Sequence, residues 1–205
     1  MELSEFINKL NGIEGREYLI DFCRKNILHG TPFIFSQKED EYYEFRKRIA
    51  HRFDVSFYEV YIMGSAKLGF SPHKRKPFDL ESDVDVAIVS EKLFSQIMDV
   101  VMDYQMKLRM SRETVTEREL RMYHDFLEYT ALGWIRPDKL PISFQVKAFK
   151  DNWFEFFRSI SYGNSEIGNY KVAAGIFKTY SHLEIYIINS IEQVRAALRV
   201  EVENG

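Results

Sequence analysis

Two aspartates separated by one residue open an apolar run in the middle of the chain. Asp83-Val84-Asp85 leads into residues 86–89, Val-Ala-Ile-Val, a composition typical of a buried strand. Neighbouring side chains of a strand point to opposite faces, so Asp83 and Asp85 share one face, with Cα atoms about 6.6 Å apart. Two carboxylates on an apolar strand are costly to bury without a positive partner. The pair therefore predicts a divalent cation site, most simply for Mg²⁺, which prefers oxygen ligands.

Gly64-Ser65 forms the second half of the predicted site. This dipeptide ends a shorter apolar run, Val60–Met63, which also has the composition of a strand. Glycine permits a sharp turn and a close approach to a ligand. Ser65 and the amides that follow can open a short helix whose free N–H groups suit a phosphate, and Lys67 is placed to bind phosphate as well. One half would hold phosphates and the other half a metal.

The order of these features resembles the signature of the DNA polymerase β-like nucleotidyltransferase superfamily, small stand-alone bacterial type. In that signature a strand ends in Gly-Ser, and Asp-x-Asp follows inside a second strand after an insert. The motif covers residues 64–89 here, and the likeness extends loosely to about residue 150. The resemblance implies an α+β fold, with a small mixed β-sheet core, helices packed on it, and added N- and C-terminal helices.

The same resemblance implies an enzyme that moves a nucleoside monophosphate from an NTP or dNTP to a hydroxyl acceptor and releases pyrophosphate. Two Mg²⁺ or Mn²⁺ ions would be held by Asp83 and Asp85, which are then the catalytic carboxylates. Gly64 and Ser65 would bind the triphosphate. The acceptor would be an oligonucleotide or a protein side chain.

The third carboxylate that the family places on a later strand is not evident. Residues 142–150 form a candidate strand, whose polar face carries Gln145 and Lys147. We expect Gln145 as the third catalytic residue and Lys147 as a phosphate ligand, although an amide oxygen cannot act as a base. Three alternatives stay open: a third acid from Asp138 or Asp151, a substituted sequence, or a degenerate site.

Composition narrows the class of protein. The chain has 205 residues and a formal charge of −3, which argues against bulk attraction to duplex nucleic acid. Its single cysteine, Cys23, excludes an internal disulfide and fits a reducing cytoplasm. No apolar run has the length of a membrane span, and the first residues lack a secretory signal pattern. We expect a cytoplasmic protein without membrane insertion.

The elements that must position the site follow from hydrophobic periodicity. We expect one nucleotidyltransferase domain over residues 1–205, with N-terminal helices in 1–55, a catalytic core in 56–150 and a helical, aromatic part in 151–205. The insert 67–81, which carries the basic tetrad His73–Lys76, is predicted to be a loop. The expected helices are two within 3–28, then 37–53 with Ser36 as N-cap, 91–110, 116–132, 151–160 and 179–200; the expected strands are 60–63, 83–89, 142–150 and 170–177.

Several functions are compatible with this pattern. The first is template-independent synthesis of a nucleotide signal or oligonucleotide in bacterial anti-phage defence, with an effector protein as a further partner. The alternatives are a toxin–antitoxin nucleotidyltransferase that modifies RNA or protein, and a catalytically degenerate nucleotide-binding or partner-binding module, which Gln145 favours. A nucleic-acid-binding protein that uses the loop at 73–76 is a further alternative. The sequence does not specify the base, the sugar or the oligomeric state.

Overall fold

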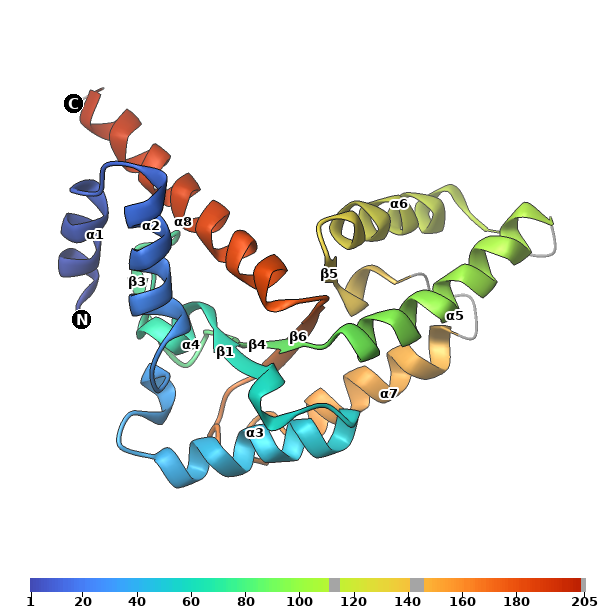
Figure 1. Ribbon diagram of the computed structural model, residues 1–205. Coiled ribbons are helices and arrows are strands. Elements are labelled where there is room, and N and C mark those ends of the chain that lie inside the picture. Colours follow the sequence, from blue (N-terminus) through green and yellow to red (C-terminus); the bar gives the residue numbers. More distant parts are fainter. Residues whose placement is uncertain (111–114, 141–145, 204–205) are drawn as a thin grey trace.

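A four-stranded mixed sheet lies at the centre of the chain, with helices on both faces (Figure 1). The computed structural model describes residues 1–110, 115–140 and 146–203. The strands follow the order β1-β4-β6-β5, in which β4 and β6 are parallel and the two outer pairs are antiparallel. The predicted α+β architecture, with a small mixed sheet and helices at both ends of the chain, is confirmed. The sheet strands are β1 (Val60–Met63), β4 (Val84–Val89), β5 (Trp134–Ile135) and β6 (Val172–Phe177).

Eight α-helices lie within the described ranges. Ser90 caps α5 by accepting a hydrogen bond from the Leu93 N–H, and Thr116 and Glu119 form a reciprocal capping box at the start of α6. No described helix combines the length and apolar character that crossing a membrane requires. The helices are α1 (Leu3–Asn11), α2 (Arg16–Cys23), α3 (Glu39–Phe53), α4 (Gly64–Leu68), α5 (Glu91–Arg109), α6 (Glu117–Ala131), α7 (Val146–Ser159) and α8 (Tyr180–Glu203).

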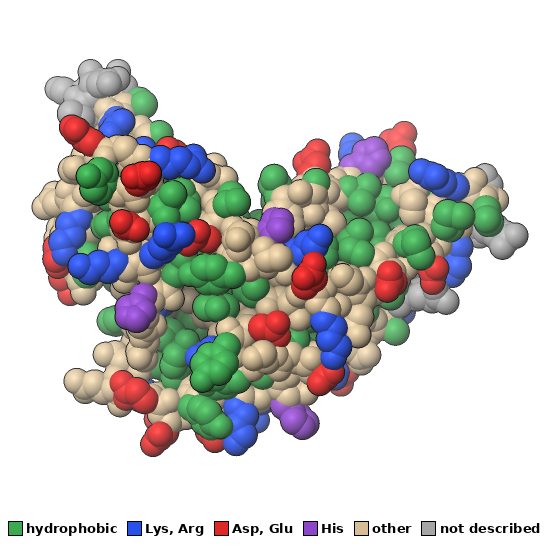
Figure 2. All heavy atoms as spheres, in the orientation of Figure 1, with side chains coloured by type: hydrophobic (Ala, Val, Ile, Leu, Met, Phe, Trp, Pro, Cys, Tyr) green, Lys and Arg blue, Asp and Glu red, His purple; other side chains and the backbone are tan. Residues whose placement is uncertain are grey.

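The two faces of the sheet belong to two separate apolar cores. Val84, Val86 and Ile88 of β4 pack with side chains of α3, α5, α6 and α7. Ala87 and Val89, which point the other way, pack with α1, α2 and α8. In the space-filling view, a notch separates the part built from α1, α2 and α8 from the part built from α5 and α6 (Figure 2).

The candidate strand over 142–150 is wrong in its described part. From Val146 the chain is helical, and α7 runs without interruption through the helix predicted for 151–160. Phe149, Trp153 and Phe157 recur every four residues along it, and both Trp153 and Phe157 are buried. The alternation of polar and apolar residues that predicted a strand covers only a few residues. The helical spacing of the apolar residues extends over a longer stretch and is the more reliable signal.

Two further boundaries differ from expectation. Ser36 does not cap α3, because the helix begins three residues later, at Glu39. Ser36 instead ends a short 3₁₀ helix, in which its N–H donates to the carbonyl of Phe33. The insert is not simply a loop. After α4 it forms a two-stranded hairpin, β2 (Phe70–Ser71) with β3 (Lys76–Pro77).

Replacing Phe45 with alanine tests the support that α3 gives to β1. Phe45 is fully buried in the core that also holds Val60 and Ile62. We expect Phe45→Ala to lower the free energy of unfolding by about 3–5 kcal/mol, since it leaves a cavity. Denaturant unfolding measures this. Glu44→Ala, at an exposed position of the same helix, should stay within about 0.5 kcal/mol; equal losses for the two variants would contradict this packing.

Candidate active site

Asp83 and Asp85 face a common cavity. Asp83 directly precedes β4 and Asp85 is its second residue. The antiparallel pairing of β1 with β4 sets Met63 opposite Asp85, so that the Gly64-Ser65 turn follows beside the carboxylate. Gly64, Ser65 and both aspartates line a cavity of about 840 Å³. The structure therefore brings these four predicted residues together.

The Gly64 turn lies close to the Asp85 carboxylate. The φ of Gly64 is +61°, in the left-handed region that favours glycine. A Cβ atom at this position would lie 2.8 Å from Oδ2 of Asp85, closer than carbon and oxygen pack without displacement. Both the turn conformation and the space in front of Asp85 thus require glycine here.

Small residues form the sheet surface beside Asp85. Ala173 of β6 pairs with Asp85, and Gly175 pairs with Ala87 two positions further along the strands. All three of these small residues line the cavity. The other walls come from the β2–β3 hairpin, α8, β5 and the segment that follows β5, and they include His73, Lys74, Trp134, Arg136, Asp138, Tyr186 and Ser190.

Lys171 supplies a positive charge at the carboxylate pair. Its carbonyl accepts a hydrogen bond from the Val84 N–H at 2.8 Å, and its Nζ donates to Oδ2 of Asp83 at 2.6 Å. The bond to Asp83 raises the pKa of Lys171. Sequence reasoning missed this residue. The available signal was its position: Lys171 directly precedes the β6 run, as Asp83 directly precedes the β4 run.

Asp85 is the electrostatically perturbed member of the pair. Water reaches its carboxylate from the cavity, but protein surrounds the remaining sides. This partial desolvation is the main cause, and the Asp83 charge the second, of a rise in the pKa of Asp85 to about 6. The positive charges of Lys171 and Lys74 oppose the rise. At neutral pH Asp85 is therefore mostly ionised and gains from a nearby cation.

The carboxylates of Asp83 and Asp85 are donors of the kind that a hard divalent cation binds. Within the described ranges, no cluster of three or more His, Cys, Asp or Glu side chains is placed to hold a metal. Asp138 lines the cavity, but its carboxylate bonds the Arg136 guanidinium at 2.8 Å. Gln145 lies outside the described residues. Mg²⁺ is commonly bound by one or two carboxylates together with substrate phosphates and water, a set that Asp83 and Asp85 can supply.

The two lysines predicted to bind phosphate are placed elsewhere. Lys67 is buried, and its Nζ donates to the carbonyl oxygens of His29, at 2.6 Å, and of Gly30. Burial lowers the pKa of Lys67 to about 8. Lys147 is exposed on the first turn of α7 and is not among the described residues that line the cavity. The cavity instead presents Lys74 and Lys171.

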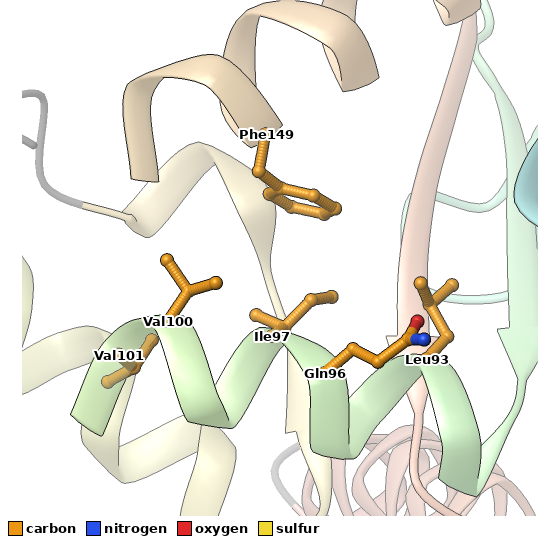
Figure 3. A pocket seen from close by; sticks show the side chains of 6 residues that line it. All are labelled: Leu93, Gln96, Ile97, Val100, Val101 and Phe149. Atoms are coloured by element: carbon orange, nitrogen blue, oxygen red, sulfur yellow. The ribbon is translucent and has the colours of Figure 1, made fainter. Parts of the chain in front are cut away.

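A second, smaller cavity of about 160 Å³ lies between α5 and α7. The ring of Phe149 on α7 faces the side chains of α5 across it (Figure 3). Among the described residues that line it, none is ionisable, and Gln96 is the one with a polar side chain. The larger cavity is the candidate site because the chemistry-bearing residues line that one. The smaller is lined by Leu93, Gln96, Ile97, Val100, Val101 and Phe149.

Comparison with known proteins does not identify a relative of this chain. No protein-family model, curated protein or solved structure matches the chain. The case for the site therefore depends on the residues themselves: two carboxylates, a glycine turn packed against one of them, and a lysine bonded to the other.

Lys67→Met tests the structural role of the buried ammonium. The variant keeps most of the side-chain volume but leaves the carbonyls of His29 and Gly30 without this donor. We expect a loss of about 1–3 kcal/mol in the free energy of unfolding, since buried acceptors lose a charged donor. Lys147→Met is the exposed control and should be close to neutral. A destabilisation of equal size in both variants would refute the assignment.

Asp85→Asn should make the protein more stable at neutral pH. The pKa of Asp85 is raised in the folded state, so the neutral form stabilises the fold below about pH 4 and this contribution is lost as pH rises to about 6. An amide is neutral throughout. After allowance for screening of an exposed carboxylate, we expect a gain of about 1 kcal/mol at pH 7, or about 2–4 °C in Tm.

Thermal unfolding between pH 4 and pH 7 measures this effect. The Tm difference between Asp85→Asn and the unsubstituted protein should grow across that interval. Asp103→Asn, at an exposed position on α5, is the matched control and should show a difference that does not change with pH. A flat difference for Asp85→Asn as well would contradict the desolvation of this carboxylate.

Proposed function

We propose that the chain transfers a nucleoside monophosphate from a nucleoside triphosphate to a hydroxyl acceptor and releases pyrophosphate. The observation that carries the proposal is the position of the Gly64 turn, where a Cβ atom would lie 2.8 Å from Oδ2 of Asp85, with Asp83 and Ser65 on the same cavity. Phosphoryl-type transfer needs positioning and charge neutralisation more than covalent help, and this arrangement offers both.

Different side chains of the cavity would bind the phosphates and neutralise their charge. The Ser65 hydroxyl borders the cavity and can donate to a phosphate oxygen. Lys74 and Lys171 add positive charge near the carboxylates. A divalent cation held by Asp83 and Asp85 would neutralise phosphate charge and favour ionisation of the acceptor hydroxyl. Because Lys171 bonds Asp83 directly, it shares that carboxylate with any cation and can turn toward a phosphate.

An aromatic wall supports recognition of the nucleoside. The rings of Trp134 and Tyr186 lie 4.7 Å apart, and Trp134 stacks on Phe177 with an interplanar angle of 2°. All three residues line the cavity, and Tyr186 is 41% exposed. An open aromatic face of this kind suits stacking of a base, which tolerates different bases. The cavity volume is also at the upper end of the range for small-molecule sites.

A second candidate function is nucleotide binding without turnover. Two observations favour it: among the described residues no third His, Cys, Asp or Glu side chain joins Asp83 and Asp85 in a cluster placed to hold a metal, and Lys171 already neutralises part of the charge of Asp83. Such a module would bind a triphosphate through the same groups and leave it intact.

Pyrophosphate release separates the two functions. We expect release from at least one of the eight common NTPs and dNTPs with Mg²⁺ or Mn²⁺, when the protein is supplied with an oligonucleotide acceptor. Asp85→Asn should slow release by about 10²-fold or more, because it removes charge that acts in the transition state. Asp103→Asn should not change it. Triphosphate binding without pyrophosphate from any of the eight would favour the second candidate.

Gly64→Ala provides a matched variant for the same assay. Gly163 also has a positive φ, +82°, but no atom lies within 4 Å of the position of its Cβ, so Gly163→Ala carries similar backbone strain without a steric contact. Only Gly64→Ala should displace the Asp85 carboxylate and slow pyrophosphate release. Equal rates for these two folded variants would argue against the contact that carries the proposal.

A further inference from the structure

A serine and a histidine meet across the cavity from the carboxylates. Nε2 of His73, in the β2–β3 hairpin, lies 2.8 Å from Oγ of Ser190 on α8, a hydrogen bond between residues 117 positions apart. Both side chains line the same cavity as Asp83 and Asp85. The pair therefore places a hydroxyl and a base in the space where the triphosphate would bind.

The segments that carry this pair both approach Asp85. Tyr186 lies one helical turn before Ser190, and its pKa is raised by burial and then by the charge of Asp85. Lys74 follows His73 directly, and its charge acts in turn on the Asp85 carboxylate. The hairpin and α8 thus form two walls of the cavity that the carboxylates also line.

The geometry of the pair is that of an activated nucleophile. A serine hydroxyl is weak at neutral pH and becomes reactive when a neighbouring base within about 2.6–3.2 Å accepts its proton. A neutral imidazole protonated at Nδ1 leaves Nε2 free to accept from Oγ. The alternative role is mechanical, since the same hydrogen bond ties the hairpin to α8.

We propose that Ser190 is an internal acceptor, so that the chain attaches a nucleoside monophosphate to its own side chain with His73 as the general base. The inference rests on the proposed nucleotidyl transfer and names one acceptor for it. It assigns a catalytic task to His73 and a modification site to Ser190.

The step balances with a nucleoside triphosphate as the only co-reactant. Oγ of Ser190 attacks the α-phosphorus and forms an O–P bond, while its proton passes to Nε2 of His73. The bond from the α-phosphorus to the oxygen bridging the α- and β-phosphates breaks, and pyrophosphate leaves with the electron pair. Lys74 and Lys171 lie on the same cavity and can neutralise charge on the leaving group. The product is a phosphodiester between the serine and the nucleoside.

The experiment incubates the full chain with each NTP and dNTP and Mg²⁺ or Mn²⁺, then measures intact mass and maps peptides. We expect a mass gain of one nucleoside monophosphate, located on Ser190 and absent from Ser190→Ala. His73→Gln can still hydrogen-bond Ser190 but cannot take its proton, so labelling should slow by about 10²-fold. Ser181→Ala, at an exposed serine of the same helix, should label like the unsubstituted protein.

Four outcomes would overturn the inference. Label on another residue would, and so would labelling of His73→Gln at the unsubstituted rate, since that would leave the hydrogen bond a mechanical role only. Transfer of the nucleoside monophosphate to an oligonucleotide supplied in a parallel incubation, with pyrophosphate released and Ser190 unmodified, would also overturn it, while the proposed function would stand. Absence of both pyrophosphate and label with every triphosphate would overturn the two together.

Discussion

The pairing of β1 with β4 is the constraint on which the rest of the site depends. Met63 opposes Asp85 in this ladder, and the next residue, Gly64, must therefore turn directly beside the carboxylate. A slip of one residue in a strand pairing sends every side chain to the opposite face. Because Val84, Val86 and Ile88 are buried on the other face of the sheet, such a slip is strongly disfavoured. The apolar core thus sets the position of the polar site.

Acidic and basic side chains that line the cavity form ion pairs with one another. Asp83 bonds Lys171, and Arg136 bonds Asp138. Asp85 makes no direct bond of this kind within the described part of the chain, and desolvation and the charge of Asp83 raise its pKa. A triphosphate with a divalent cation carries charges of both signs. Each member of these ion pairs could therefore exchange its partner in the protein for a group of opposite charge on the ligand. An anion or a cation alone could replace only part of them.

Local features were predictable from the sequence, and pairings between distant residues were not. The runs that form β1 and β4 and the periodicity of α5 and α6 are visible in the sequence, and so is the glycine at the end of β1. The role of Lys67 was missed because its partners, His29 and Gly30, lie 38 and 37 residues away. The contact between His73 and Ser190 spans 117 positions and leaves no periodic signal. At 142–150 the stretch was too short for its alternation to be told from a helix.

The buried Lys67 couples the Gly-Ser turn to the beginning of the chain. Its ammonium, one helical turn from Gly64, is satisfied by carbonyls of the segment that follows α2. Removing the first thirty residues would take away both carbonyl acceptors of this ammonium. The segment that follows α2 is therefore part of the support of the Gly-Ser turn. The geometry of one end of the sheet therefore depends on two carbonyl groups that lie 38 and 37 residues away in the sequence.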